Sequence, residues 1–132
     1  EICACLVGSE MCIRDSSKIG DAFTIAEFVM GVNETTEADL PETVLAWDLV
    51  RAVNMARWAF ICGYINEDEM WEAIRTTAGI AKESFSSWEE YGNSFAVGRG
   101  IWRGETDDYE TADEVVGALL NKEDSPWKAI EW

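Results

Sequence analysis

Apolar residues recur along most of the chain at spacings of three and four, and polar segments separate these stretches from one another. This pattern is typical of helices, and no segment shows the strict alternation expected of a strand. It predicts helices over residues 17–33, 42–64, 66–83 and 111–121, with a further helix opening at Ser87. We therefore expect an all-α fold, a single compact domain of about five helices.

The segment 42–64 stands out because more than twenty residues pass without Gly or Pro until Gly63. Its apolar side chains cover nearly every face of the predicted helix, which is typical of a helix surrounded by others. We expect it to be the central, buried helix of the fold, entered through a polar linker that ends at Pro41.

Local signals mark where the other helices begin and how closely they pack. Three capping boxes are predicted, pairing Asn66 with Glu69, Ser87 with Glu90, and Thr111 with Glu114. Glycines at 92, 98 and 100 weaken a helix, so they indicate either close helix contact or an early end near Arg99. The tail 125–132 carries two Trp residues and should pack against the body.

The first sixteen residues have a different character. Residues 6–15, LVGSEMCIRD, equal the translation of a transposase sequencing adapter. We interpret residues 1–16 as adapter-derived and non-native, leave 17–132 as the domain, and expect the true start of the reading frame to be missing. A metal site or disulfides built on Cys3, Cys5 and Cys12 then lose their support, and Cys62 is expected to be a small buried side chain.

Charge and composition narrow the classes of function. The formal net charge of −16 repels phosphate backbones, so direct nucleic-acid binding is not expected. No apolar run is long enough to span a bilayer, and we expect a cytoplasmic protein. The acidity is either a well-solvated surface or a docking face for a basic partner.

The catalytic groups of many enzymes are missing from the composition. The chain has no His, which excludes Ser-His-Asp triads and His-ligated metals, and it has no nucleotide-binding glycine motif. Acid pairs such as Asp107 with Asp108 are best explained as charge at helix starts, where the helix dipole favours it. We expect no catalytic residues, no metal and no cofactor.

Four polar residues of the central segment, Asp48, Arg51, Asn54 and Arg57, follow one another at spacings of three. If other helices surround this one, the arginines are partly buried and need carboxylates, because an unpaired buried charge is costly. One interpretation is a salt-bridge network that fixes helix register. The alternative is a pocket in which arginines face a ligand carboxylate or phosphate, with Trp residues as stacking surfaces.

Motifs spread over residues 46–132 resemble the bacterial domain-of-unknown-function family DUF1266. They are the Trp-Asp-x-x-Arg start at 47–51, the Arg at 57, Gly-Tyr at 63–64, Ser-Trp-Glu at 87–89, Gly-Arg-x-x-Trp at 98–102 and Ser-Pro-Trp at 125–127. The resemblance implies no particular activity.

Two functions remain open. The first is a non-enzymatic accessory or immunity-type interaction module whose acidic surface docks a basic protein. The second is an enzyme or binder for a small anionic ligand. The candidate ligand-binding residues are Trp47, Asp48, Arg51, Arg57, Tyr64, Glu69, Trp88, Arg99 and Trp102.

Overall fold

The computed structural model describes the backbone of residues 9–132 and the side chains of residues 18–132 apart from Ala38. Over this range the chain forms helices and no strand, which confirms the all-α prediction. The elements are α2 (Ser9–Asn33), the 3-10 helix η1 (Glu37–Asp39), α3 (Leu45–Ile61), α4 (Glu67–Ser84), α5 (Trp88–Arg103), α6 (Thr106–Asn121) and the short α7 (Pro126–Ala129). None of the described helices is long and apolar enough to cross a membrane.

The N-terminal helix is longer than expected, because α2 begins at Ser9 rather than at residue 17. Residues 1–8, including Cys3 and Cys5, lie outside the described residues. The adapter interpretation of residues 1–16 stays a prediction.

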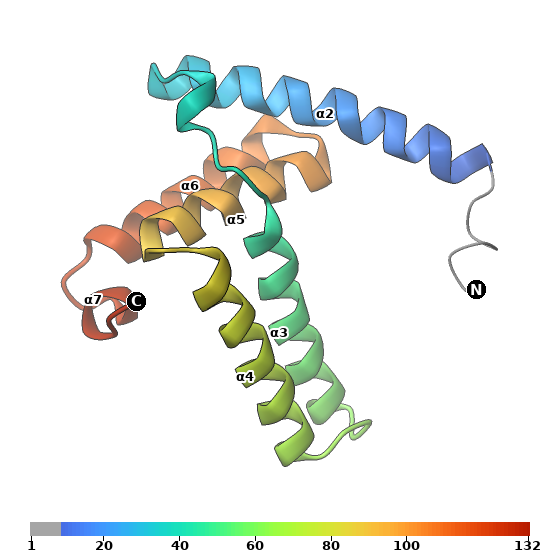
Figure 1. Cartoon of the computed structure of the whole chain (residues 1–132), viewed down its shortest axis with the longest axis vertical. Helices are drawn as coiled ribbons and strands as arrows, with labels where there is room; N and C mark the ends of the chain where they lie inside the picture. Colours follow the sequence, from blue (N-terminus) through green and yellow to red (C-terminus); the bar gives the residue numbers. More distant parts are fainter. Residues whose placement is uncertain (1–8) are drawn as a thin grey trace.

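Helix α5 is the centre of the fold, since it packs against α2, α3 and α6 (Figure 1). Its glycines allow these approaches. A Cβ at Gly92 would lie 2.5 Å from Val116 Cγ1, and one at Gly98 would lie 2.6 Å from Trp47 Cβ. The close-contact interpretation is therefore confirmed, and the early end near Arg99 is wrong because α5 continues to Arg103.

The prediction of a central buried helix over 42–64 is wrong. Helix α3 instead pairs with α4, and together they project from the α2–α5–α6 group as an antiparallel hairpin (Figure 1). Only Ala46, Leu49 and Ala56 of α3 are buried. A helix that is apolar on nearly all faces therefore has neighbours on only part of its circumference.

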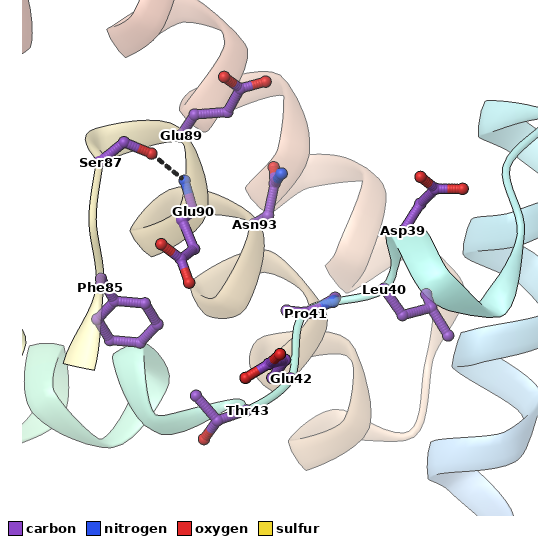
Figure 2. A pocket seen from close by; sticks show the side chains of 10 residues that line it. All are labelled: Asp39, Leu40, Pro41, Glu42, Thr43, Phe85, Ser87, Glu89, Glu90 and Asn93. Carbon is purple, nitrogen blue, oxygen red and sulfur yellow. Dashed lines mark hydrogen bonds between the residues drawn. The ribbon is translucent and has the colours of Figure 1, made fainter.

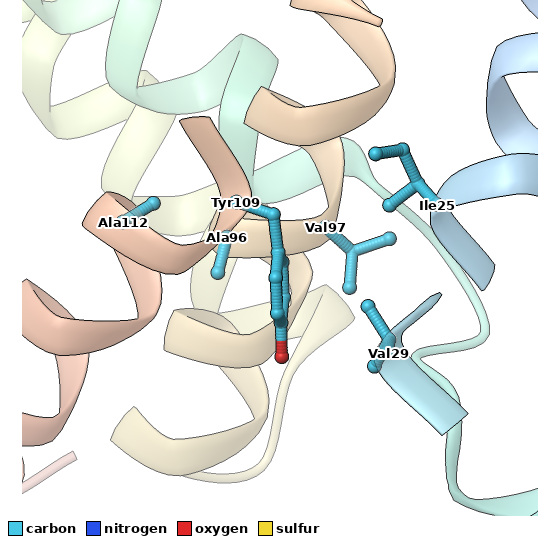
Figure 3. Packing of buried hydrophobic residues seen from close by; sticks show 6 residues of the cluster. All are labelled: Ile25, Val29, Ala96, Val97, Tyr109 and Ala112. Atoms are coloured by element: carbon cyan, nitrogen blue, oxygen red, sulfur yellow. The ribbon is translucent and has the colours of Figure 1, made fainter. Parts of the chain in front are cut away.

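The main core forms where α2, α5 and α6 meet. Ile25 and Val29 of α2 face small and branched residues of α5 and the ring of Tyr109 from α6 (Figure 3). Tyr109 is buried, while its hydroxyl accepts a hydrogen bond from Asn33 Nδ2 at 3.2 Å. The tyrosine thus fills the core and keeps its polar end satisfied.

The hairpin is anchored to α5 at its base. Helix α3 begins after Val44, which offers no side-chain cap, and the Ala46 N–H donates instead to Ser94 Oγ of α5 at 3.2 Å. Ser94 is fully buried, so this bond satisfies an amide that the helix itself cannot. Ala46, Leu49 and Phe85 form a second buried cluster beside it.

Helix starts follow one of the three capping-box predictions in full and one in part. Asn66 and Glu69 form the expected capping box. Ser87 Oγ accepts from the Glu90 N–H, but the Glu90 carboxylate accepts from Ser86, so the second box is only half formed. The third prediction is wrong, because α6 already begins at Thr106. Thr111 lies inside that helix and donates its hydroxyl to the Asp107 carbonyl.

The Trp-rich tail packs against the body, as predicted. Trp127 stacks on Trp88 with ring centroids 4.8 Å apart. Trp132 Nε1 donates to the Phe85 carbonyl at 2.8 Å. The tail therefore covers the junction between α4 and α5.

Candidate functional site

An open pocket of about 380 Å³ lies between α3 and α5 and is lined by several aromatic side chains. We call it the Trp–Arg pocket. It is lined by Trp47, Val50, Arg51, Asn54, Met55, Trp58, Phe95, Arg99 and Trp102. Its size falls in the range of small-molecule sites, which are also mostly apolar with a few polar groups.

The α3 residues of the pocket share one side of the helix because they alternate spacings of four and three. Trp47, Arg51, Asn54 and Trp58 follow this rule, which keeps side chains on one face at 3.6 residues per turn. The sequence interpretation used steps of three instead. Six residues after Arg51, such steps carry Arg57 about 120° around the helix and away from the pocket.

Two guanidinium groups flank the aromatic rings of the pocket. Arg51 Cζ lies 5.9 Å from the ring centroid of Trp47 and 5.4 Å from that of Trp102. Arg99 Cζ lies 5.6 Å from the Trp47 ring. Both contacts are within cation–π range, so the rings hold the arginine planes without neutralising their charge.

The floor of the pocket contains an unsatisfied donor. Trp47 packs against Phe95 and Trp102, with ring centroids at 5.4 and 5.7 Å. Its Nε1 is buried and has no hydrogen-bond partner among the described residues. Buried donors are normally paired, so the unpaired indole N–H is a local cost to stability.

The two arginines differ in how far their charge is compensated. Arg99 Nη2 lies 2.7 Å from Asp108 Oδ1, and Asp108 Oδ2 accepts from Arg103 Nε at 3.2 Å. Arg51 reaches only Asp48, at 3.8 Å, in a pair that is largely exposed. Arg99 is therefore fixed by α6, whereas Arg51 carries most of the uncompensated positive charge of the pocket.

The structure brings together four of the nine candidate residues and disperses the others. Trp47, Arg51, Arg99 and Trp102 line the pocket, and Asp48 lies beside it through its pair with Arg51. The remaining four lie elsewhere: Arg57, Tyr64 and Glu69 towards the outer end of the hairpin, and Trp88 in the aromatic cluster of the tail.

The expectation that Arg51 and Arg57 are partly buried and paired with carboxylates holds only in part. Arg51 lies 3.8 Å from Asp48 with its side chain 45% exposed. Arg57 is exposed and makes no ion pair within the described part of the chain. Two carboxylates that could pair with these arginines have other partners. Glu69 accepts from the Asn66 N–H in the capping box of α4, and Glu90 accepts from the Ser86 N–H. The physical reason is that α3 has solvent, not helices, on this side. Cys62 is likewise exposed rather than buried.

The candidate residues omit five of the residues that line the pocket: Val50, Asn54, Met55, Trp58 and Phe95. Asn54 entered the sequence analysis only through the polar pattern of the central segment. A search of α3 for residues on the same face as Trp47 would have found Asn54 and Met55, which follow it by about two turns. Phe95 comes from another helix, and no local signal connects it to the pocket.

A second concavity, of about 340 Å³, has the opposite character (Figure 2). Asp39, Glu42, Glu89 and Glu90 line it around Pro41, and no basic residue does. Hydrogen bonds from the backbone and side chain of Thr36 lower the pKa of Asp39. Hydrogen bonds from Ser86 lower the pKa of Glu90. Both carboxylates therefore stay ionised well below neutral pH.

A smaller cavity of about 250 Å³ adjoins it, beside Tyr109 and Asp113. Burial raises the pKa of Tyr109, and burial with the repulsion of Glu114 raises the pKa of Asp113. Within the described range, no group of three or more His, Cys, Asp or Glu is arranged to hold a metal ion.

A family model described as "Protein of unknown function (DUF1266)" matches residues 8–132. The chain belongs to the DUF1266 family. The match extends the resemblance, expected over 46–132, through α2 as well. No curated protein and no solved structure matches this DUF1266 chain.

Proposed function

We propose that this DUF1266 protein is a non-enzymatic binding module whose principal site is the Trp–Arg pocket. Its ligand carries a carboxylate or phosphate on an apolar or aromatic body. The observation that carries the proposal is the position of Arg51, which lies against two indole rings at an open pocket rather than inside a closed ion pair.

The chemistry of the lining supports binding of an anion. Arg51 offers several N–H donors in a planar group that matches a carboxylate, and Asn54 adds an amide. The exposed Trp58 and Trp102 rings give an aromatic body a surface to stack on.

The same lining argues for binding without catalysis. Its only ionisable side chains are Arg51 and Arg99, and guanidinium groups stay protonated at any pH where the protein functions. Neither is therefore suited to general acid–base chemistry. The pocket can hold and orient an anionic group but offers no proton acceptor to it.

A pair of probes with the same aromatic body, one charged and one neutral, tests the proposal. Isothermal titration calorimetry would compare naphthalene-2-carboxylate with naphthalene-2-methanol. We expect the carboxylate to bind more tightly by about tenfold, the contribution of one charge-assisted hydrogen bond. Arg51→Gln should remove this preference, while Arg75→Gln, exposed on α4 and outside the pocket, should retain it. Equal affinity of the wild-type protein for both probes would contradict the proposal.

A second candidate function is docking of a basic protein on the acidic surface. It is supported by the four carboxylates around Pro41 and by the net charge of −16. Affinity for an oligolysine peptide should fall steeply with salt, because screening acts over about 8 Å at physiological ionic strength. Glu89→Gln should weaken binding more than Glu123→Gln, which lies outside the concavity. Salt-independent binding would contradict this function.

A further inference from the structure

The outer half of α3 presents a row of large apolar side chains that no described residue covers. Met55, Trp58, Ile61 and Tyr64 are 62%, 62%, 74% and 83% exposed. Each step of three turns 60° around the axis, so Met55, Trp58 and Ile61 form a diagonal band over about 120° of α3, and Tyr64 follows in the turn. Met55 and Trp58 also line the Trp–Arg pocket. We call these four residues the hairpin patch. Soluble monomers seldom leave such contiguous apolar surface open to water.

The hairpin patch lies on the part of the molecule that projects furthest from the core. Helices α3 and α4 extend away from the α2–α5–α6 group, so the body does not obstruct an approach from outside (Figure 1). Ala56, which faces the other way, is buried. One side of α3 is thus a helix interface within the chain, and the patch is a second one without a partner.

Charge is distributed unevenly between the hairpin and the body. Residues 45–84 carry six acidic and four basic side chains, a net charge of −2. Residues 18–44 and 85–132 together carry seventeen acidic and five basic side chains, a net charge of −12. Within residues 18–132 the hairpin is therefore the nearly neutral part, where two copies can meet with little repulsion.

We propose that two copies of this chain associate through the hairpin patch. Both signs of charge occur in the outer half of the hairpin, with Arg57 on α3 and Glu67 and Asp68 at the start of α4, and none of them makes an ion pair in the described structure. A two-fold interface brings the same surface together with itself, so it needs such mixed, self-complementary charge. A strongly basic partner would prefer the body, and a strongly acidic one would be repelled by it.

The size of the patch sets the strength of the association. Aromatic side chains such as Trp58 and Tyr64 bury roughly 150–250 Å² each, and Met55 and Ile61 add smaller areas, so the patch gives about 500 Å² per copy. Two such surfaces bury about 1,000 Å², at the low end of specific interfaces. We expect a reversible dimer that dissociates on dilution and that tightens as salt screens the repulsion between the acidic bodies.

Sedimentation velocity of the full chain in reducing buffer, over a wide concentration range, tests the proposal. The wild type should pass from monomer to dimer. Ile61→Glu should raise the dissociation constant by at least about thirtyfold, because a symmetric interface counts the change twice. Val115→Glu adds the same charge at an exposed apolar site on α6 and should leave the dimer unchanged.

Two further arms keep the result interpretable. If circular dichroism shows that Ile61→Glu is misfolded, Tyr64→Ser replaces it, since Tyr64 follows the end of α3 and is exposed. Neither Ile61 nor Tyr64 lines the Trp–Arg pocket, so a folded variant should still bind naphthalene-2-carboxylate if the proposed function is right. A wild type that stays monomeric throughout, or variants that dimerise like the wild type, would overturn the dimer and leave the ligand site untouched.

Discussion

Adding one methyl group at Gly98 should separate α3 from α5 and destabilise the protein. The new Cβ would lie 2.6 Å from Trp47 Cβ and 3.2 Å from both Val44 Cβ and the Val44 carbonyl oxygen. These atoms belong to the backbone or sit directly on it, so they cannot rotate away. The start of α3 must move as a unit, and the Trp47 ring moves with it.

The size of the effect follows from two opposing contributions. Overpacking of this kind costs about 1–3 kcal/mol. Replacing a helical glycine by alanine returns up to about 1 kcal/mol of helix propensity. We therefore expect Gly98→Ala to lower the free energy of unfolding by about 1–2 kcal/mol, which corresponds to a fall in Tm of roughly 3–8 °C for a chain of this length.

Gly79 supplies a matched control in the same kind of helix. A Cβ there meets no atom within 4 Å, and the position is exposed on α4. Gly79→Ala gains the propensity without the clash, so its Tm should rise by up to about 3 °C. Thermal unfolding followed by circular dichroism measures both. A Gly98→Ala protein as stable as the Gly79→Ala protein would refute the close packing of α5 against α3.

Three further changes test other parts of the structure. Asp108→Asn leaves Arg99 and Arg103 with a neutral partner and should lower the free energy of unfolding in urea by about 1 kcal/mol. The loss is modest because both arginines are partly exposed. An unchanged free energy of unfolding would contradict a stabilising role for these ion pairs. Asn66→Ala removes the cap of α4 and should cost about 1 kcal/mol, whereas an unchanged urea midpoint would argue against the capping box. Folding raises the pKa of Asp113, so its ionised form destabilises the folded state at neutral pH. Asp113→Asn should therefore stabilise the protein at neutral pH. The gain should vanish as the pH falls below the pKa that Asp113 has in the unfolded chain. A gain that is independent of pH would show another cause.

Much of the fold was predictable because its signals are local. The capping box at Asn66 and Glu69 and the 3.6-residue periodicity located α4 almost to the residue. The glycines of α5 indicated close packing, although the sequence left an early helix end as an alternative. Only the contacts of Gly92, Gly98 and Gly100 with three different neighbours decide between the two.

The failed predictions concern which faces of a helix are covered. An apolar circumference on 45–61 has two causes that look alike in sequence, burial by neighbouring helices or an exposed surface that serves binding. In the structure, Trp58 and Ile61 are exposed rather than covered by neighbouring helices. The periodicity of a sequence gives the angle between side chains around the helix axis. It does not tell how many other helices pack against each face.

The site was half predictable for a related reason. Trp47 and Arg51 are one turn apart, so local geometry joins them. Arg99 and Trp102 lie about fifty residues away and meet the first pair only because Gly98 lets α5 approach α3. Such a meeting depends on tertiary packing, and a single sequence contains no direct record of it.

The central claim is that Arg51 serves a ligand and not the fold. Thermal unfolding of the wild type and of Arg51→Ala, each with and without naphthalene-2-carboxylate, tests it most directly. We predict equal Tm values for the two free proteins, within about 0.5 kcal/mol of stability, because the substitution is at an exposed position. Ligand at about a hundred times its Kd should stabilise the wild type by about 2.7 kcal/mol and the variant much less. A free Arg51→Ala protein that unfolds, or an equal ligand shift in both proteins, would contradict the account.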